Sequence, residues 1–225
     1  MKSTVNKTGL LGSKWLKNII IGLAMIAAPM QAAFATVILT GDRNAINPGY
    51  FVNWGAVGPD GTPTGSPFTL GEVTVSGASG FTVFSGSTYN ADFTPTDEVL
   101  ALFDGDIVGG IFSITFAHAV QAAGAQIQAN AFGAFSGWIS AYDASNVLLG
   151  TYLVSGINGG NGTGSAVFAG LVSTGRDIMR IDFSSFGDGA AINGLSVSVP
   201  EPSTWLMLII GLGFIAFARK RGQSV

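Results

Sequence analysis

Alternation of apolar and polar residues with a period of two is the feature that most constrains the fold of this chain. The stretches 112–116, 179–183 and 195–199 each carry apolar side chains at every second position, with Ser, Thr, Arg or Asp between them. Successive side chains of a strand point to opposite faces of a sheet, so the pattern predicts half-buried β-strands. Helical periodicity does not recur between the two ends of the chain, which predicts an all-β domain.

Further short apolar segments, separated by Gly, Asn, Asp and Pro, extend this prediction. Strands are expected at 36–40, 68–75, 81–84, 99–103, 111–116, 125–132, 138–142, 147–154, 165–172, 179–183 and 195–199. Asp143 to Asn146 is expected to form a hairpin turn. About ten short strands in one domain predict a jelly-roll-like antiparallel β-sandwich over 36–198. The Gly- and Pro-rich stretch 55–67 could instead be a low-complexity segment.

The charge of this central domain differs from that of the whole chain, which is −3. Residues 36–199 contain twelve Asp and Glu, three Arg and no Lys, and 3 − 12 = −9. Nucleic-acid binding depends on Lys and Arg that neutralise phosphates, and anionic lipid surfaces attract basic segments. The composition therefore argues against both partners. Cysteine is absent, so packing must stabilise the domain without disulfides, with or without a bound cation.

The last 27 residues, 199–225, have a three-part organisation. Pro200, Glu201 and Pro202 interrupt the preceding strand, because Pro lacks a backbone N–H and restricts the residue before it. A membrane-spanning helix is predicted over 204–218, and basic residues follow it, which favour the cytoplasmic side. These are Arg219, Lys220 and Arg221. The apolar part is shorter than the roughly 20 residues of a usual spanning helix, so an ordinary anchor or a buried core helix is the alternative.

In all three parts this tail resembles the PEP-CTERM sorting domain of Gram-negative bacteria. The resemblance implies that Pro200, Glu201 and Pro202 are read by exosortase, a membrane enzyme similar to cysteine transpeptidases, in hosts that usually make extracellular polysaccharide. The same short domain also carries the label "ice-binding protein C-terminal". A shared sorting signal does not imply a shared activity, so the label is no evidence of ice binding.

The first 35 residues have the features of a secretory signal peptide. The first 17 residues carry four lysines and no acid, and a short apolar run over 19–28 follows. Ala33 and Ala35 supply the small side chains that signal peptidase prefers, which predicts cleavage after Ala35. An N-terminal membrane anchor is the alternative reading. Together the two ends predict that 36–198 lies outside the cytoplasm, with the inner membrane as a transient or lasting partner.

Three segments inside the domain, 53–61, 124–128 and 141–146, are similar to pieces of uncharacterised exported β-sandwich domains that often carry this tail. That resemblance supports the fold and implies no established activity.

Few residues of the domain suit catalysis. The one histidine, His118, follows an expected strand and is interpreted as a strand-end residue, and a Gly-x-Ser-x-Gly elbow is missing. A glycosidase needs two carboxyl groups facing one bond. Asp97, Glu98, Asp104 and Asp106 are the candidates for such a pair, and a solvated loop beside the 99–103 strand is the competing interpretation.

Calcium is the one cofactor that the sequence suggests. Its ligands are hard oxygens in loops, and Asp104 and Asp106 could supply part of a site, as could Asp182 with Asp188. The loop 159–164 resembles a calcium-binding nonapeptide repeat, but a glycine replaces the ligand Asp, so a flexible glycine loop is expected.

The favoured hypothesis is a non-catalytic binding or structural protein that associates with exopolysaccharide, and a polysaccharide-acting hydrolase is the alternative. Sugar recognition uses aromatic platforms together with a few polar groups. The candidate aromatic residues are Tyr50, Phe51, Trp54, Tyr89, Trp138, Tyr142 and Tyr152. Trp54 is preferred, because it lies in a Gly- and Pro-rich segment expected to be an exposed loop.

Overall fold

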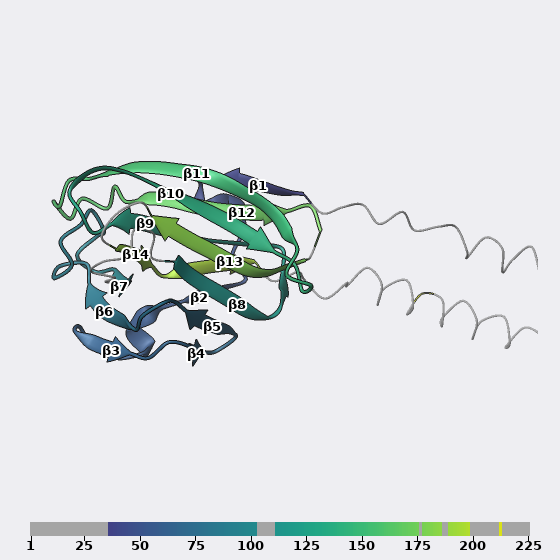
Figure 1. Cartoon of the computed structure of the whole chain (residues 1–225), viewed down its shortest axis with the longest axis horizontal. Coiled ribbons are helices and arrows are strands. Elements are labelled where there is room, and N and C mark those ends of the chain that lie inside the picture. The colour runs from purple at the N-terminus through teal and green to yellow at the C-terminus, as the bar shows by residue number, and fades with distance from the viewer. Residues whose placement is uncertain (1–35, 103–110, 176, 186–188, 199–211, 213–225) are drawn as a thin grey trace, which may run out of the picture. The chain divides into compact units, whose positions relative to one another are not determined.

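A computed structural model describes residues 36–102, 111–175, 177–185, 189–198 and 212. The described chain is built almost entirely from antiparallel strands in two sheets (Figure 1), which confirms the predicted β-sandwich. The predicted signal peptide, the Pro200–Pro202 motif and almost all of the 204–218 segment fall outside the described residues. In the part of the chain that is described, no helix is long and apolar enough to cross a membrane.

The larger sheet has nine strands, with the order β1-β12-β9-β14-β7-β6-β3 and with β15 joining β2 to β9. Its strands are β1 (Val37–Thr40), β2 (Tyr50–Val52), β3 (Thr62–Thr64), β6 (Phe81–Ser85), β7 (Glu98–Leu102), β9 (Ala122–Ala129), β12 (Val167–Ser173), β14 (Ala190–Asn193) and β15 (Leu195–Ser198). Two short 3-10 helices, η1 (Arg43–Ile46) and η2 (Trp54–Ala56), lie between its first strands.

The smaller sheet has six strands in the order β11-β10-β13-β8-β5-β4. Its strands are β4 (Phe68–Leu70), β5 (Val73–Ser76), β8 (Ile111–Val120), β10 (Gly133–Tyr142), β11 (Leu148–Asn158) and β13 (Ile178–Ser185). The predicted single strand over 68–75 is wrong, because Gly71 adopts φ +58° and turns the chain between β4 and β5. The stretch 55–67 is ordered rather than structureless, since β3 pairs with β6.

The alternation seen in the sequence places one face of each strand in a core between the sheets. Phe112 and Ile114 of β8, Phe183 of β13 and Leu100 of β7 are all fully buried there. A second, smaller cluster lies on the other face of β7, where Val99 and Ala101 point. The segment 86–95 covers this face with Tyr89 and Phe93. The sheet is therefore buried on both sides at one end, and the candidate site is built there.

Strand β9 fixes the distance between the two ends of the domain. Its first residue, Ala122, pairs with Ser198, and Thr36 lies at the same end, because its carbonyl oxygen accepts from the Thr174 N–H. Its last residue, Ala129, accepts a hydrogen bond from Asn158 at the opposite end. The seven steps from Ala122 to Ala129, at about 3.3 Å each, separate these ends by roughly 23 Å. Thr36 and Ser198, the first and last residues of the described domain, therefore lie at the same end of it.

Candidate functional site

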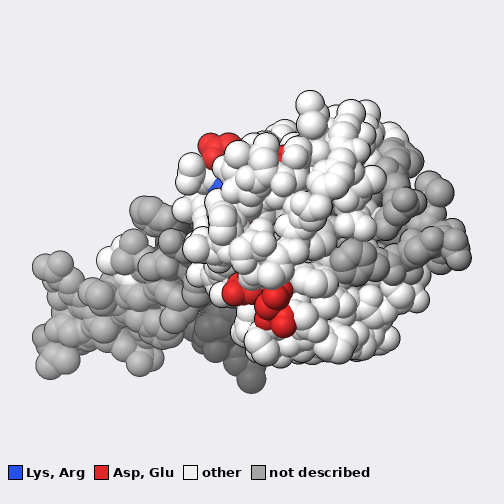
Figure 2. Space-filling model, turned by 90° about the vertical axis from the view of Figure 1, so that its left-hand side faces the viewer, with Lys and Arg blue, Asp and Glu red and all other residues white. Residues whose placement is uncertain are grey.

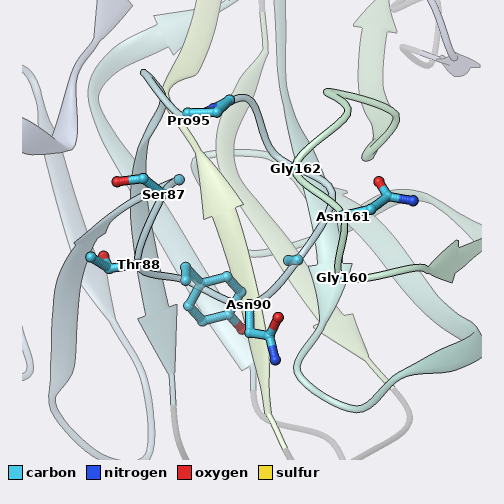
Figure 3. A pocket seen from close by; sticks show the side chains of 10 residues that line it. Ser87, Thr88, Asn90, Pro95, Gly160, Asn161 and Gly162 are labelled. Carbon is cyan, nitrogen blue, oxygen red and sulfur yellow. The ribbon is translucent and has the colours of Figure 1, made fainter.

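A pocket of about 580 Å³ opens between two loops at the end remote from Thr36 and Ser198. Its lining residues are Gly86, Ser87, Thr88, Tyr89, Asn90, Ala91, Pro95, Gly160, Asn161 and Gly162. Figure 3 shows Ser87 and Thr88 on one side of the pocket and Gly160, Asn161 and Gly162 on the other. Hydroxyl, amide and backbone groups dominate this lining, and its volume is that of a small-molecule site.

Asp92 holds the two loops together from beneath the pocket. Its carboxylate is buried, with 3% of the residue exposed. Oδ2 accepts from the Gly159 N–H at 2.7 Å, and Oδ1 accepts from the Asn161 N–H at 2.9 Å. The two bonds join residues that lie 67 and 69 positions apart in the sequence. The loop 159–164, which was expected to be flexible, is therefore fixed by a carboxylate from a distant part of the sequence. No local pattern in 159–164 could have predicted that contact.

Two buried amides extend this support. Gln128 of β9 donates to Asp92 Oδ2 at 3.1 Å and accepts from the Asp92 N–H at 2.8 Å. Asn158, at the end of β11, accepts from the Gly160 N–H at 3.0 Å and donates to the Ala129 carbonyl at 2.9 Å. Each buried polar atom is thereby satisfied, which makes the base of the pocket rigid.

The protonation of Asp92 follows from two opposed effects. Desolvation raises its pKa, whereas hydrogen bonds from Asn161, Gly159 and Gln128 lower it, and the net result is a pKa below the ordinary value. The carboxylate is thus ionised at neutral pH, and it serves as an acceptor for the loop rather than as a proton donor to a ligand.

Phe132 lies against Gly160, which is one of the residues that line the pocket. The glycine has φ +63°, and a Cβ placed on it would lie 2.3 Å from Phe132 Cε1. The ring therefore rests directly on the glycine backbone, and 61% of the residue remains exposed. Exposed aromatic faces bind the C–H groups of sugar rings. The sequence reasoning missed Phe132, because it placed this residue at the end of the expected strand 125–132, whereas β9 ends at Ala129.

Asp60 supports the opposite side of the pocket. Its Oδ1 accepts from the Thr88 hydroxyl at 2.6 Å and from the Ser85 N–H at 2.9 Å. These hydrogen bonds, from Thr88 first and then from Ser85, lower the pKa of this exposed carboxyl. Thr88 is thus fixed with its hydroxyl engaged, and the Ser87 hydroxyl pairs with the Ser85 hydroxyl at 2.7 Å.

Trp54, the preferred aromatic candidate, lies in the core, and that expectation is wrong. The side chain is fully buried, and its Nε1 donates to the Asn193 carbonyl at 2.9 Å. The segment forms η2 under the Asn53 side chain, which accepts from the Gly55 N–H, so it is no open loop. The buried indole has no face for a sugar.

The remaining aromatic candidates are spread over the molecule. Tyr89 lines the pocket, with most of its ring packed beside Phe93, and burial raises its pKa. Arg180 stacks on Tyr142 at 3.9 Å, and the Tyr152 hydroxyl donates to the Val37 carbonyl at 2.6 Å.

Three others are not among the residues that line the pocket. Arg43 stacks on Phe51 at 5.6 Å. Trp138 is 40% exposed on the outer face of the smaller sheet. Tyr50 lines a cavity of about 190 Å³ with Glu72 and His118, and desolvation, with a contribution from Glu72, raises the Tyr50 pKa to about 12.

The carboxylate candidates that the structure describes lie in a turn, at the start of a strand and in an ion pair. Asp97 accepts from the Thr94 N–H at 2.8 Å and closes a turn before β7. Glu98 is the first residue of β7, and Asp104 and Asp106 lie outside the described residues, as does Asp188. Asp182 pairs with Arg180 at 3.0 Å. Within the described ranges, no group of three or more His, Cys, Asp or Glu side chains could hold a metal ion.

Comparison with known proteins identifies the tail. Residues 198–221 match the PEP-CTERM protein-sorting motif, which confirms the resemblance deduced from the sequence. The chain is thus an exported protein with a C-terminal sorting tail. No functionally curated protein matches the chain.

Several solved structures share distant similarity with the domain. They include CpGH89CBM32-6 produced by Clostridium perfringens, with 10% identity, a TM-score of 0.32, and coverage of 59% of this chain and 97% of that one. CsCBM6-3 from Clostridium stercorarium, in complex with cellobiose, has 14% identity, a TM-score of 0.32, and coverage of 64% and 98%. The enzymatically active domain of bacteriophage CBA120 tailspike protein 4 has 13% identity, a TM-score of 0.24, and coverage of 62% and 19%. Similarity at this level leaves the activity to be argued from the site.

Proposed function

We propose that this chain is a non-catalytic protein of the cell surface or extracellular matrix that binds neutral exopolysaccharide in the pocket between loops 86–95 and 159–164. The observation that carries the proposal is the polar pocket whose glycine loop is fixed by Asp92, with the exposed ring of Phe132 against its lining residue Gly160. Amide and backbone groups suit sugar hydroxyls, and the ring suits a sugar face.

The charge of the domain favours a neutral glycan. Its net charge of 3 − 12 = −9 repels uronate or sulfate groups. Figure 2 views the end that lies at the left in Figure 1, and it shows acidic patches with almost no basic surface. A neutral polymer avoids this repulsion.

The position of the pocket suits a tethered protein. Ser198, the last described residue before the tail, lies at one end of β9, and the pocket lies beyond the other end. A domain held through its C-terminus would therefore present the pocket away from the point of attachment. This supports a role in which processing by exosortase delivers the domain and the pocket engages the surrounding polymer.

A binding measurement tests the activity. Protein isolated from its producing cells is titrated calorimetrically with the purified exopolysaccharide of the same cells and with cello-oligosaccharides. Phe132→Ala is expected to weaken binding by about tenfold, as loss of one aromatic contact does. Trp138→Ala, which removes an exposed indole on the other sheet, serves as the matched control and should change affinity less than twofold.

Two outcomes would contradict this proposal. Equal loss of affinity in both variants would show that the pocket is not the binding site for the polymer. Release of reducing sugar ends during the titration would favour the hydrolase alternative, and substitution of Asp97, Glu98, Asp104 and Asp106 one at a time would then locate its carboxylates.

The sorting proposal has its own test. Signal peptidase is proposed to release residues 1–35, so that the mature protein begins at Thr36, and N-terminal sequencing of exported protein would detect an intact leader. Replacement of Pro200, Glu201 and Pro202 by alanine leaves the apolarity of 204–218 unchanged. We expect unprocessed precursor in the inner membrane, and normal surface delivery would show that the tail acts only as an anchor.

Calcium at Asp104 and Asp106 stays a proposal as well. An ion bound only by the folded state raises the melting temperature by mass action. Equal melting temperatures in calcium and in chelator would reject a structural site.

A further inference from the structure

Strand β11 forms one edge of the smaller sheet, and its outer side meets no other strand among the described residues. It runs for eleven residues, Leu148–Asn158, and pairs with β10 alone. The other edge strands are short, since β1 has four residues and β3 and β4 have three each. β11 is therefore the longest open edge of the described domain (Figure 1).

From Gly150 onward this edge lacks the features that usually prevent strands from pairing with other chains, and the one irregularity in its register lies at Leu149, opposite the Ala141–Tyr142 step. Natural proteins protect open edges with charged residues, Pro or strong bulges. The stretch 148–158 contains no charged residue and no Pro, whereas β3 contains Pro63. Leu153 and Ile157 are 51% and 68% exposed. The domain has a net charge of −9, so like charges oppose contact between two copies. β11 is the long edge strand that a second copy can approach without such like-charge contacts, because it is uncharged and apolar.

The backbone groups of alternate residues point toward the open side. The Trp138 carbonyl accepts from the Ser184 side-chain hydroxyl of β13 at 3.5 Å, so this carbonyl points toward β13 and away from β11. Leu153 lies opposite Trp138 in the ladder and therefore belongs to a non-hydrogen-bonded pair, with its N–H and C=O turned outward. Thr151 and Ser155 share this direction, because the pattern repeats every second residue. The Ile157 carbonyl lies on the same side by this alternation, but it accepts from Gln128 of the other sheet at 3.1 Å, so the open part of the edge ends before Ile157.

The sequence of β11 is nearly symmetric about Leu153. At equal distances on either side stand Gly150 and Gly156, Thr151 and Ser155, Tyr152 and Val154, and Leu149 and Ile157. When a strand pairs with a copy of itself in antiparallel register about its centre, each of these residues lies opposite its counterpart. Glycine then meets glycine, hydroxyl meets hydroxyl and apolar meets apolar.

We propose that β11 pairs with β11 of a second copy about a two-fold axis at Leu153, which joins two six-stranded sheets into one continuous sheet. An isologous contact of this kind closes on itself and stops at the dimer. The pairing leaves the loops 86–95 and 159–164 of both copies open, so one particle would carry two pockets. Two linked sites on one polymer bind more tightly than either alone.

Single-cysteine crosslinking tests the contact and its register in the full chain, which has no native cysteine. A hydrogen-bonded antiparallel pair has Cα atoms about 5.5 Å apart, within the range of a disulfide. Leu153→Cys is therefore expected to form a covalent dimer under mild oxidation at least about tenfold faster than Thr151→Cys, whose two copies lie away from the axis. A mixture of Thr151→Cys and Ser155→Cys chains should crosslink, because these positions face each other.

Ile38→Cys provides the matched control, since Ile38 is 58% exposed on the edge strand of the other sheet. A second variant, Leu153→Lys, brings two like charges together at the axis and should convert the dimer to monomer in light scattering without changing the melting temperature of the monomer. Equal crosslinking at positions 38, 151 and 153, or a monomeric wild-type protein at about 100 μM, a concentration that populates even weak specific dimers, would overturn the proposal. A dimer that persists unchanged in Leu153→Lys would place the contact elsewhere and overturn it as well.

Discussion

The hairpin turn 143–146 and the glycine-rich loop 159–164 flank the same strand, β11, yet they are ordered by different means. In the turn, Asp143 Oδ1 accepts from the N–H groups of Ser145 and Val147 at 2.8 Å each, and Asn146 adopts φ +62°. These backbone contacts come from within four residues, and the Arg180 side chain of β13 adds one long-range hydrogen bond to Asn146 Oδ1. In the loop, the acceptor is Asp92, which belongs to another segment of the chain.

The difference shows that two connections beside the same strand can serve different purposes. A turn stabilised locally forms wherever its sequence occurs, and it can only reverse the chain. A loop whose hydrogen-bond acceptor comes from a distant residue depends on the whole fold. Its bonds bring two segments of the chain together, and these segments form a pocket. Four predictions test this comparison, in order of the expected effect.

Asp92→Ala should have the largest effect. It leaves the Gly159 and Asn161 N–H groups and the Gln128 amide without their acceptor, and unsatisfied buried donors cost about 1 to 3 kcal/mol each, partly relieved by water. We expect a loss of about 3 kcal/mol in the free energy of unfolding, measured by urea titration, together with loss of glycan binding. A change below about 1 kcal/mol would show that the loop holds itself.

Gly160→Ala and Gly162→Ala form the next pair. Both glycines have φ +63°, so each substitution costs about 1 to 2 kcal/mol of backbone strain. At Gly160 the new Cβ would also meet the Phe132 ring, whereas at Gly162 the nearest atoms are 3.8 Å away. Only Gly160→Ala is therefore expected to weaken glycan binding. Equal glycan binding by the two variants would show that Phe132 is not part of the binding site.

Asp143→Ala should have a smaller effect, confined to the turn. It removes a local cap, which typically stabilises by about 1 kcal/mol. The melting temperature should fall by about 2 to 4 °C, and glycan binding should stay unchanged. A loss of binding as large as that of Asp92→Ala would mean that the two loops are coupled.

The smallest effect is expected in the pH dependence of stability. The pKa of Asp92 is lowered in the folded state, because its hydrogen bonds outweigh desolvation. Its contribution is therefore complete above the unfolded pKa of 3.8 and is lost as the pH falls through the lower, folded value. Asp92→Asn should flatten the decline in stability below pH 3.8, and an identical acid profile for both proteins would assign that decline to other carboxyls.

Much of the architecture could be predicted from alternation alone. Period two in 112–116 and 179–183 placed Phe112 and Phe183 in the core, and Asp and Asn at 143 and 146 marked the hairpin, because both signals act over a few residues. The break at Gly71 escaped prediction, since a glycine within an apolar run fits a strand as well as a turn.

The candidate site was decided mostly beyond the reach of the sequence. Trp54 looked exposed because its neighbours are Gly and Pro, yet Asn193, 139 residues away, provides the acceptor that lets its indole enter the core. Phe132 and Asp92 were not chosen as site residues, because their neighbours in the sequence show no pattern typical of a binding site. The sequence by itself determined the strands, the charge and the sorting tail, because these depend on neighbouring residues. Only the tertiary structure decided the pocket, because a buried carboxylate can order a loop only after folding brings segments some 67 residues apart within 3 Å.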